Sequence, residues 1–237
     1  MLLELLACVR TIPPVAQPPA VTLQARLKVQ VEAAGMSISF PGVLVLDGED
    51  RGHLAALGPL GAPVVTVTGV GDAVAIRDVR QRIVYIGASA DDVLATVLGL
   101  GVEDLWDLFR GDVADWGRWQ PADPTLGTLR MERKGVDGDR YEVLSESNGR
   151  PIRVEWVDAQ GTVEGELRWT GFVTAPDGVG AVPDGWVWSW PARGVHIEIV
   201  AESWRRPDPN PSIFDLVPPQ GFEVRPLEAL PLGAFTP

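Results

Sequence analysis

Apolar and polar residues alternate without interruption from Val21 to Glu32, in the order Val-Thr-Leu-Gln-Ala-Arg-Leu-Lys-Val-Gln-Val-Glu. Successive side chains of a β-strand point to opposite faces of its sheet, so this period of two predicts a strand with one solvated and one buried face. At about 3.3 Å per residue the strand spans about 40 Å, roughly twice the usual length. We therefore expect a large, curved, antiparallel sheet whose apolar face is covered by side chains or by a ligand.

Shorter β-like segments, separated by turn signals, follow this first strand. Asp137-Gly138 and Asn148-Gly149 are typical of two-residue hairpin turns, because both positions need the positive φ that Asn, Asp and Gly tolerate. This spacing predicts antiparallel neighbours rather than parallel βαβ units. The expected strands are Met36–Leu46, His53–Leu57, Val64–Thr68, Ala73–Arg77, Arg82–Ile86, Leu126–Arg133, Arg140–Ser145, Ile152–Val157, Val163–Phe172, Trp186–Trp190 and Val195–Trp204.

Two short helices are expected between the two groups of strands. Ser89 followed by Asp92 is a capping-box pattern, and the apolar stripe behind it ends at Gly99. The second helix ends at Gly111, and its apolar face is formed by Val102, Leu105, Trp106 and Phe109.

Length and composition indicate one β domain of the soluble globular class. We expect a tether over residues 1–19, a β domain over residues 20–225 and a flexible tail over residues 226–237 of the 237-residue chain. No stretch is both apolar and long enough to cross a bilayer. The formal net charge of -12, without a cluster of basic residues, argues against nucleic acid as a partner.

Cys8 is the single cysteine, which excludes an internal disulfide and a cysteine-rich zinc site. Leu5-Leu6-Ala7-Cys8 has the form of a bacterial lipobox, in which the cysteine is lipidated after signal cleavage, and the Pro-rich segment that follows would then be a tether. Only seven residues precede Cys8, and Glu4 interrupts them. Two interpretations stay open: an upstream leader with a lipidated Cys8, or an ordinary cysteine.

No catalytic, cofactor or metal motif is found. Gly69-Val70-Gly71 lacks the further glycine and the helix of a dinucleotide fingerprint, so it predicts a turn. Ser89 lacks the flanking glycine of a nucleophile elbow. His53 and His196 fall in predicted strands without a ligand pattern, which favours structural roles. We expect no enzymatic activity, no cofactor and no metal, and a hydrolase is the least supported class.

Two other features have open interpretations. Trp186, Trp188 and Trp190 share one face of a strand, where three rings fill a core, lie at a membrane interface or form a sugar-binding platform; core filling is the default. Leu60 lies in the turn Gly58-Pro59-Leu60-Gly61, where a leucine is either tucked into the core, which the residues alone favour, or held out for a partner.

The order of these elements resembles the outer-membrane lipoprotein receptor and the periplasmic lipoprotein carrier of the Lol system, the LolB/LolA-like superfamily with its uncharacterised lipoprotein members. The resemblance covers about residues 20 to 225 and rests on short motifs in a fixed order. These are the long alternating strand, the Leu-Gly-Pro-Leu-Gly-Ala-Pro turn, the helix ending at Leu98-Gly99, the segment Leu105-Trp106-Asp107-Leu108-Phe109-Arg110-Gly111, the hairpins, and the closing Ser212-Ile213-Phe214-Asp215-Leu216-Val217-Pro218-Pro219-Gln220-Gly221.

The resemblance implies a mainly β fold with a few short helices: an incomplete, half-open antiparallel β-barrel with a helical lid over a hydrophobic cavity that accepts acyl chains. It also implies that Leu60, on the Pro-Leu-Gly loop, projects into the membrane. The expected partners are a lipid or lipoprotein acyl chain, a periplasmic carrier protein and the inner leaflet of the outer membrane. The expected cavity-lining residues are Leu27, Val29, Leu44, Trp106, Phe109, Trp156 and Trp169.

We therefore predict a non-enzymatic lipid- or lipoprotein-binding protein of the bacterial cell envelope, either periplasmic or anchored to the outer membrane through Cys8. A concave apolar sheet can bind an acyl chain at about 0.8 kcal/mol per buried methylene without polar chemistry. Two alternatives remain: a structural envelope lipoprotein with a closed core, and a carbohydrate-binding module that exposes the three tryptophans.

Overall fold

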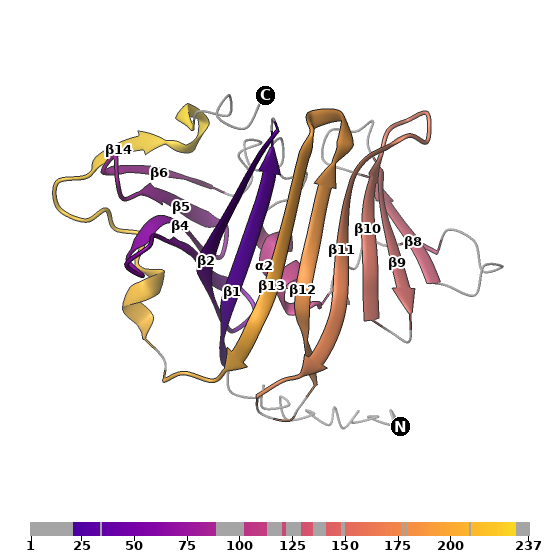
Figure 1. The fold of residues 1–237 in the computed structure, drawn as a ribbon, viewed down its shortest axis with the longest axis horizontal. Coiled ribbons are helices and arrows are strands. Elements are labelled where there is room, and N and C mark those ends of the chain that lie inside the picture. Colours follow the sequence, from indigo (N-terminus) through magenta and orange to yellow (C-terminus); the bar gives the residue numbers. More distant parts are fainter. Residues whose placement is uncertain are drawn as a thin grey trace, which may run out of the picture.

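Long antiparallel strands dominate the computed structural model, as the alternating pattern predicts (Figure 1). The described residues are 21–33, 35–88, 102–112, 120–121, 129–134, 141–147, 150–176, 178, 180–208 and 210–230, with the backbone alone described in 102–104, 120–121, 129–134 and 141–147. Cys8, the expected helix after Ser89 and both predicted Asx-Gly turns lie outside them.

The strands of the first half are β1 (Thr22–Ala33), β2 (Met36–Asp47), β3 (Arg51–Leu57), β4 (Pro63–Val70), β5 (Ala73–Asp78) and β6 (Ile83–Ala88). The second half contains β7 (Gln120–Pro121), β8 (Leu129–Lys134), β9 (Tyr141–Ser147), β10 (Arg150–Val157), β11 (Val163–Thr174), β12 (Ala181–Trp190) and β13 (Val195–Arg205). The C-terminal segment adds β14 (Glu223–Pro226), and the helical elements are α2 (Val102–Arg110) and the 3₁₀ turns η2 (Pro191–Arg193), η3 (Pro211–Phe214) and η4 (Leu227–Ala229).

All these strands belong to one sheet in the order β14-β6-β5-β4-β3-β2-β1-β13-β12-β11-β10-β9-β8-β7. The two halves of the chain join where β1 pairs with β13 in antiparallel register, with Val29 opposite Ile199. In the described part of the chain the two edge strands, β14 and β7, are not paired with each other, so the sheet is open. The prediction of a mainly β fold with a sheet that does not close is confirmed.

The core lies on the face of the sheet against which α2 packs. The odd-numbered side chains of β1 point to this inner face, and Ala25, Leu27 and Val29 are buried there. Figure 1 shows α2 behind β12 and β13, between the two halves of the sheet. The amphipathic face that the sequence predicts for residues 102–110 explains this position, since a short helix is stable only when its apolar stripe is buried.

The C-terminal segment adds one correction to the expected antiparallel sheet. The strand β14 pairs with β6 in parallel, so the sheet is not wholly antiparallel. Leu227 is fully buried in the core and Leu230 packs against it, so buried side chains continue beyond residue 225. An isolated pair of apolar residues near a chain end has no periodicity, and tertiary packing alone decides that it is held.

Candidate functional site

The tip of the β3–β4 hairpin, residues 58–63, is called the Leu60 loop. The amide of Gly58 donates to the carbonyl of Ala62 at 2.8 Å, and the amide of Gly61 donates to the carbonyl of Gly58 at 2.9 Å. Gly61 has φ of 76°, a conformation that glycine adopts without strain. This tight turn leaves the side chain of Leu60 97% exposed, so the structure places Leu60 outside the core, and membrane contact by this side chain stays a prediction.

The seven residues predicted to line a lipid cavity come together in one cluster. Each of them is at most 7% exposed, and all belong to the same hydrophobic core: Leu27, Val29, Leu44, Trp106, Phe109, Trp156 and Trp169. They come from both halves of the sheet and from α2. Their role as the lining of a lipid cavity stays a prediction.

The tryptophans of β12 form a buried aromatic wall. Trp186, Trp188 and Trp190 are 0%, 4% and 7% exposed. The rings of Trp188 and Trp190 stack with centroids 6.1 Å apart, and Trp156 stacks on Trp190 at 5.9 Å. A sugar-binding platform needs rings open to solvent, so the carbohydrate-binding alternative is wrong for these three residues. Core filling, the default interpretation, is the observed arrangement.

The helix α2 is fastened to the aromatic wall through its last turn. The carbonyl of Leu108 accepts a hydrogen bond from the indole N–H of Trp169 at 3.0 Å and from that of Trp186 at 3.2 Å. The amide of Gly111 also donates to this carbonyl at 3.1 Å, so the two indoles add to the hydrogen bond that closes the end of the helix. Phe109 meets the edge of Trp186 at a centroid distance of 5.0 Å.

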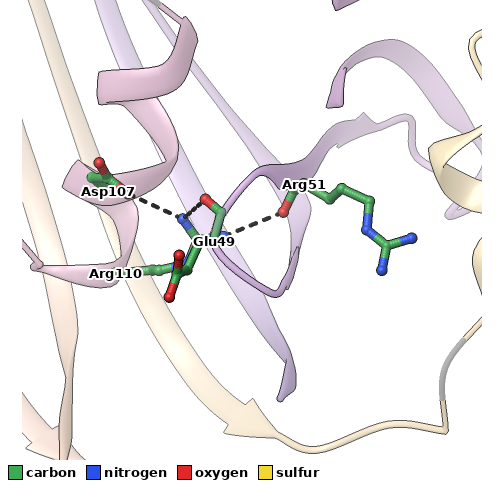
Figure 2. Close-up of polar contacts among 4 residues, drawn as sticks. All are labelled: Glu49, Arg51, Asp107 and Arg110. Atoms are coloured by element: carbon green, nitrogen blue, oxygen red, sulfur yellow. Dashed lines mark hydrogen bonds and ion pairs between the residues drawn. The ribbon is translucent and has the colours of Figure 1, made fainter. Parts of the chain in front are cut away.

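Arg110 ties the end of α2 to the β2–β3 turn (Figure 2). Its guanidinium donates to the carbonyl of Glu49 at 2.9 Å and to that of Arg51 at 3.4 Å, and it contacts the carboxylate of Asp107 at 3.3 Å. Burial lowers the pKa of Arg110, and the neighbouring Asp107 opposes this shift. The predicted segment ending at Arg110-Gly111 contains this residue, but the sequence has no signal for its partners 59 to 61 positions away.

A cavity of about 320 Å³ opens beside Arg110. Carboxylate side chains line much of it: Glu49, Asp50, Asp72, Asp107 and Asp112. Trp106 is the one residue of the predicted lipid-cavity set that lines it, and the carboxylates make this cavity unfavourable for an acyl chain. In the part of the chain that the structure describes, no group of His, Cys, Asp and Glu side chains could hold a metal ion.

Both histidines pair with hydroxyl groups on neighbouring strands. Nδ1 of His53 lies 2.8 Å from Oγ1 of Thr68, and Nδ1 of His196 lies 2.8 Å from Oγ of Ser189. Burial, with a smaller effect of Arg77, lowers the pKa of His53 to about 4. The neutral imidazole is therefore the form that the fold accommodates at this position.

Three solved structures share this architecture at low sequence identity. A DUF1329 family protein from Desulfovibrio piger has a TM-score of 0.63 at 12% identity, over 83% of this chain and 90% of that one. A putative outer membrane lipoprotein-sorting protein domain from Vibrio parahaemolyticus has a TM-score of 0.60 at 13% identity, over 78% and 85%. A LolA superfamily protein from Nitrosomonas europaea has a TM-score of 0.56 at 12% identity, over 84% and 91%.

No protein-family model matches the chain, and no curated protein sequence matches it. None of the described helices has the length and apolar character needed to span a bilayer. The resemblance that the order of motifs predicts is confirmed in three dimensions, and the chain has the LolA-like fold.

Proposed function

We propose that this protein binds the acyl chains of a lipid or lipoprotein in the bacterial cell envelope and meets a membrane through Leu60, without enzymatic activity. The observation that carries the proposal is the 97% exposure of a leucine at the tip of a tight loop on a LolA-like fold. Burying a leucine is worth about 1.5–3 kcal/mol, so a binding partner that covers Leu60 recovers a favourable interaction that the folded chain leaves unused.

The inner face of the sheet offers apolar surface beyond the cluster of buried core residues. Ile38 pairs with Val31 on this face and is 57% exposed, and Met36 is 64% exposed at the end of the same hairpin. Because Phe40 continues this row into the core cluster, the row forms an apolar path from the rim to the aromatic wall. An acyl chain laid along it would gain about 0.8 kcal/mol per buried methylene.

Two buried indole groups, one on α2 and one in the aromatic wall, also favour a ligand. The N–H groups of Trp106 and Trp188 are buried and have no hydrogen-bond acceptor among the described residues. A buried donor without an acceptor costs roughly 1–3 kcal/mol. An ester or amide carbonyl at the head of an acyl chain would accept from such a donor, so these groups would anchor the polar end of a lipid.

Native mass spectrometry of the purified protein, released from bacterial membranes without detergent exchange, tests the lipid-binding proposal. We expect adducts with the mass of a lipid or lipoprotein, and these adducts should weaken when Ile38→Asp interrupts the apolar path. Val200→Asp, on a residue of β13 that is 40% exposed, is the control for an added charge. A protein that retains no lipid and takes up none from vesicles would contradict the proposal.

The alternative is a structural envelope protein with a closed core. It is favoured by the close packing of the seven buried residues and by the tight fit of Trp106 against Gly52, which leaves no room for a methyl group there. The same mass spectrometry experiment separates the two functions, because a closed core takes up no acyl chain. An anchor at Cys8 is compatible with both functions and is tested by localisation of the expressed protein, whereas a periplasmic carrier as partner belongs to the first function.

A further inference from the structure

The turn between β5 and β6, residues 79–82, is called the arginine turn and lies beside the Leu60 loop. In the β4–β5 pairing Val65 is opposite Asp78, and the amide of Val79 donates to the carbonyl of Val64 at 3.0 Å. Both turns therefore leave the same end of two neighbouring hairpins. Arg80 and Arg82 are exposed at this end.

The backbone of Arg82 has a left-handed conformation, which residues with a side chain rarely adopt. Its φ is 55°, and every other described residue with positive φ is a glycine. A Cβ atom is strained in this left-handed region, where glycine or asparagine fits better. Residues held in such strained conformations are concentrated at functional sites.

The two arginine side chains of this turn have no charged or hydrogen-bonding partner in the part of the chain that the structure describes. The amide of Gln81 donates to Oδ1 of Asp78 at 2.9 Å, so that carboxylate caps the turn. Among the described residues neither Arg80 nor Arg82 forms an ion pair or a side-chain hydrogen bond. Two exposed guanidinium groups without a partner among the described residues thus lie beside an exposed leucine, on a chain with a net charge of -12.

The relative heights of the two turns suit a membrane surface. The last pair of the β3–β4 hairpin is Leu57 with Pro63, and Leu60 lies two to three residues beyond it, whereas the arginine turn begins level with Val64. At about 3.3 Å per residue, Leu60 lies roughly 7–10 Å farther out along the strand direction than the arginine turn. A leucine at acyl depth would thus place both guanidinium groups among the lipid headgroups, where long basic side chains reach phosphate groups.

We propose that Arg80 and Arg82 bind the phosphate groups of anionic phospholipids while Leu60 enters the bilayer, an inference that rests on the proposed membrane contact of Leu60. The overall negative charge repels an anionic membrane, so the arginine turn orients the molecule with this end toward the surface. The occupant of this surface is an anionic bilayer.

Vesicle flotation tests the inference with two compositions: phosphatidylcholine alone, and phosphatidylcholine with phosphatidylglycerol. Arg80→Gln/Arg82→Gln is compared with Arg168→Gln/Arg206→Gln, which removes the same charge from two exposed arginines elsewhere. At about fivefold per arginine, we expect roughly 20- to 30-fold weaker binding to the anionic vesicles for the first variant and little change for the second. The preference of the unaltered protein for anionic vesicles should disappear at high salt.

The Arg82→Gly variant distinguishes the contribution of the side chain to membrane binding from the contribution of the turn conformation to stability. Glycine relaxes the positive φ, so we expect an unchanged or higher melting temperature with about fivefold weaker binding to anionic vesicles. Equal binding of both double variants would overturn the inference and, if Leu60→Glu still detaches the protein, leave the proposed membrane contact in place. Failure of the unaltered protein to bind either vesicle would overturn both.

Discussion

Replacing Leu60 with glutamate separates membrane contact from folding. The side chain is 97% exposed, so the substitution exchanges one solvated side chain for another and the free energy of unfolding should change by no more than about 0.5 kcal/mol. Membrane binding loses the transfer of a leucine, about 1.5–3 kcal/mol, which corresponds to roughly 10- to 150-fold in affinity. The carboxylate makes insertion still less favourable.

Two measurements on the same preparations check this expectation: thermal unfolding by circular dichroism and binding to vesicles by flotation. Val163→Glu is the matched control, because it adds the same charge at an exposed apolar residue of a different hairpin. The control should bind vesicles like the unaltered protein. A sharp fall in the melting temperature of Leu60→Glu, or unchanged vesicle binding, would refute the reasoning.

Three further substitutions test the packing and the buried polar groups. Gly52→Ala places a methyl group inside the space of the Trp106 ring, so denaturant unfolding should show a loss of about 1–3 kcal/mol or more, part of which Trp106→Leu in the same chain should restore. Arg110→Met removes the donor to the Glu49 carbonyl, and we expect about 1–3 kcal/mol lower stability and faster hydrogen exchange in the β2–β3 turn. The folded pKa of His53, about 4, lies below the unfolded value of 6.5, so the unfolded chain binds more protons between these values and stability falls as pH falls from 6.5 to 4. His53→Gln should reduce this pH-dependent loss by on the order of 2–3 kcal/mol when unfolding is compared at pH values above and within that window.

The strands and the second helix could be predicted from the sequence because their patterns are local. The alternation in residues 21–32 reports one buried face, and β1 (Thr22–Ala33) has that face. The apolar stripe of residues 102–109 likewise predicts α2 and the face that it buries. Short β14 has no such pattern, since an edge strand of four residues is decided by its neighbour β6.

The seven buried core residues were predictable as a set, because apolar residues on the inner faces of long strands and on one helix stripe need a common place of burial. The hydrogen bonds between distant elements were not predictable in this way. Trp169 and Trp186 donate to one carbonyl of α2, and Arg110 donates to carbonyls on another hairpin, over separations of about 60 to 80 residues. These bonds depend on how the elements meet, which no spacing in the sequence encodes.

The sequence by itself determined which residues alternate, which turn contains Leu60 and which strand has three tryptophans, because side-chain periodicity and turn chemistry are properties of neighbouring residues. The tertiary structure decided that Leu60 is exposed and that Trp186, Trp188 and Trp190 are buried. It also brought the arginine turn beside the Leu60 loop, through the pairing of β4 with β5. The physical reason is that exposure and adjacency depend on which surfaces cover one another, and a chain acquires that property only when its strands and its helix pack together.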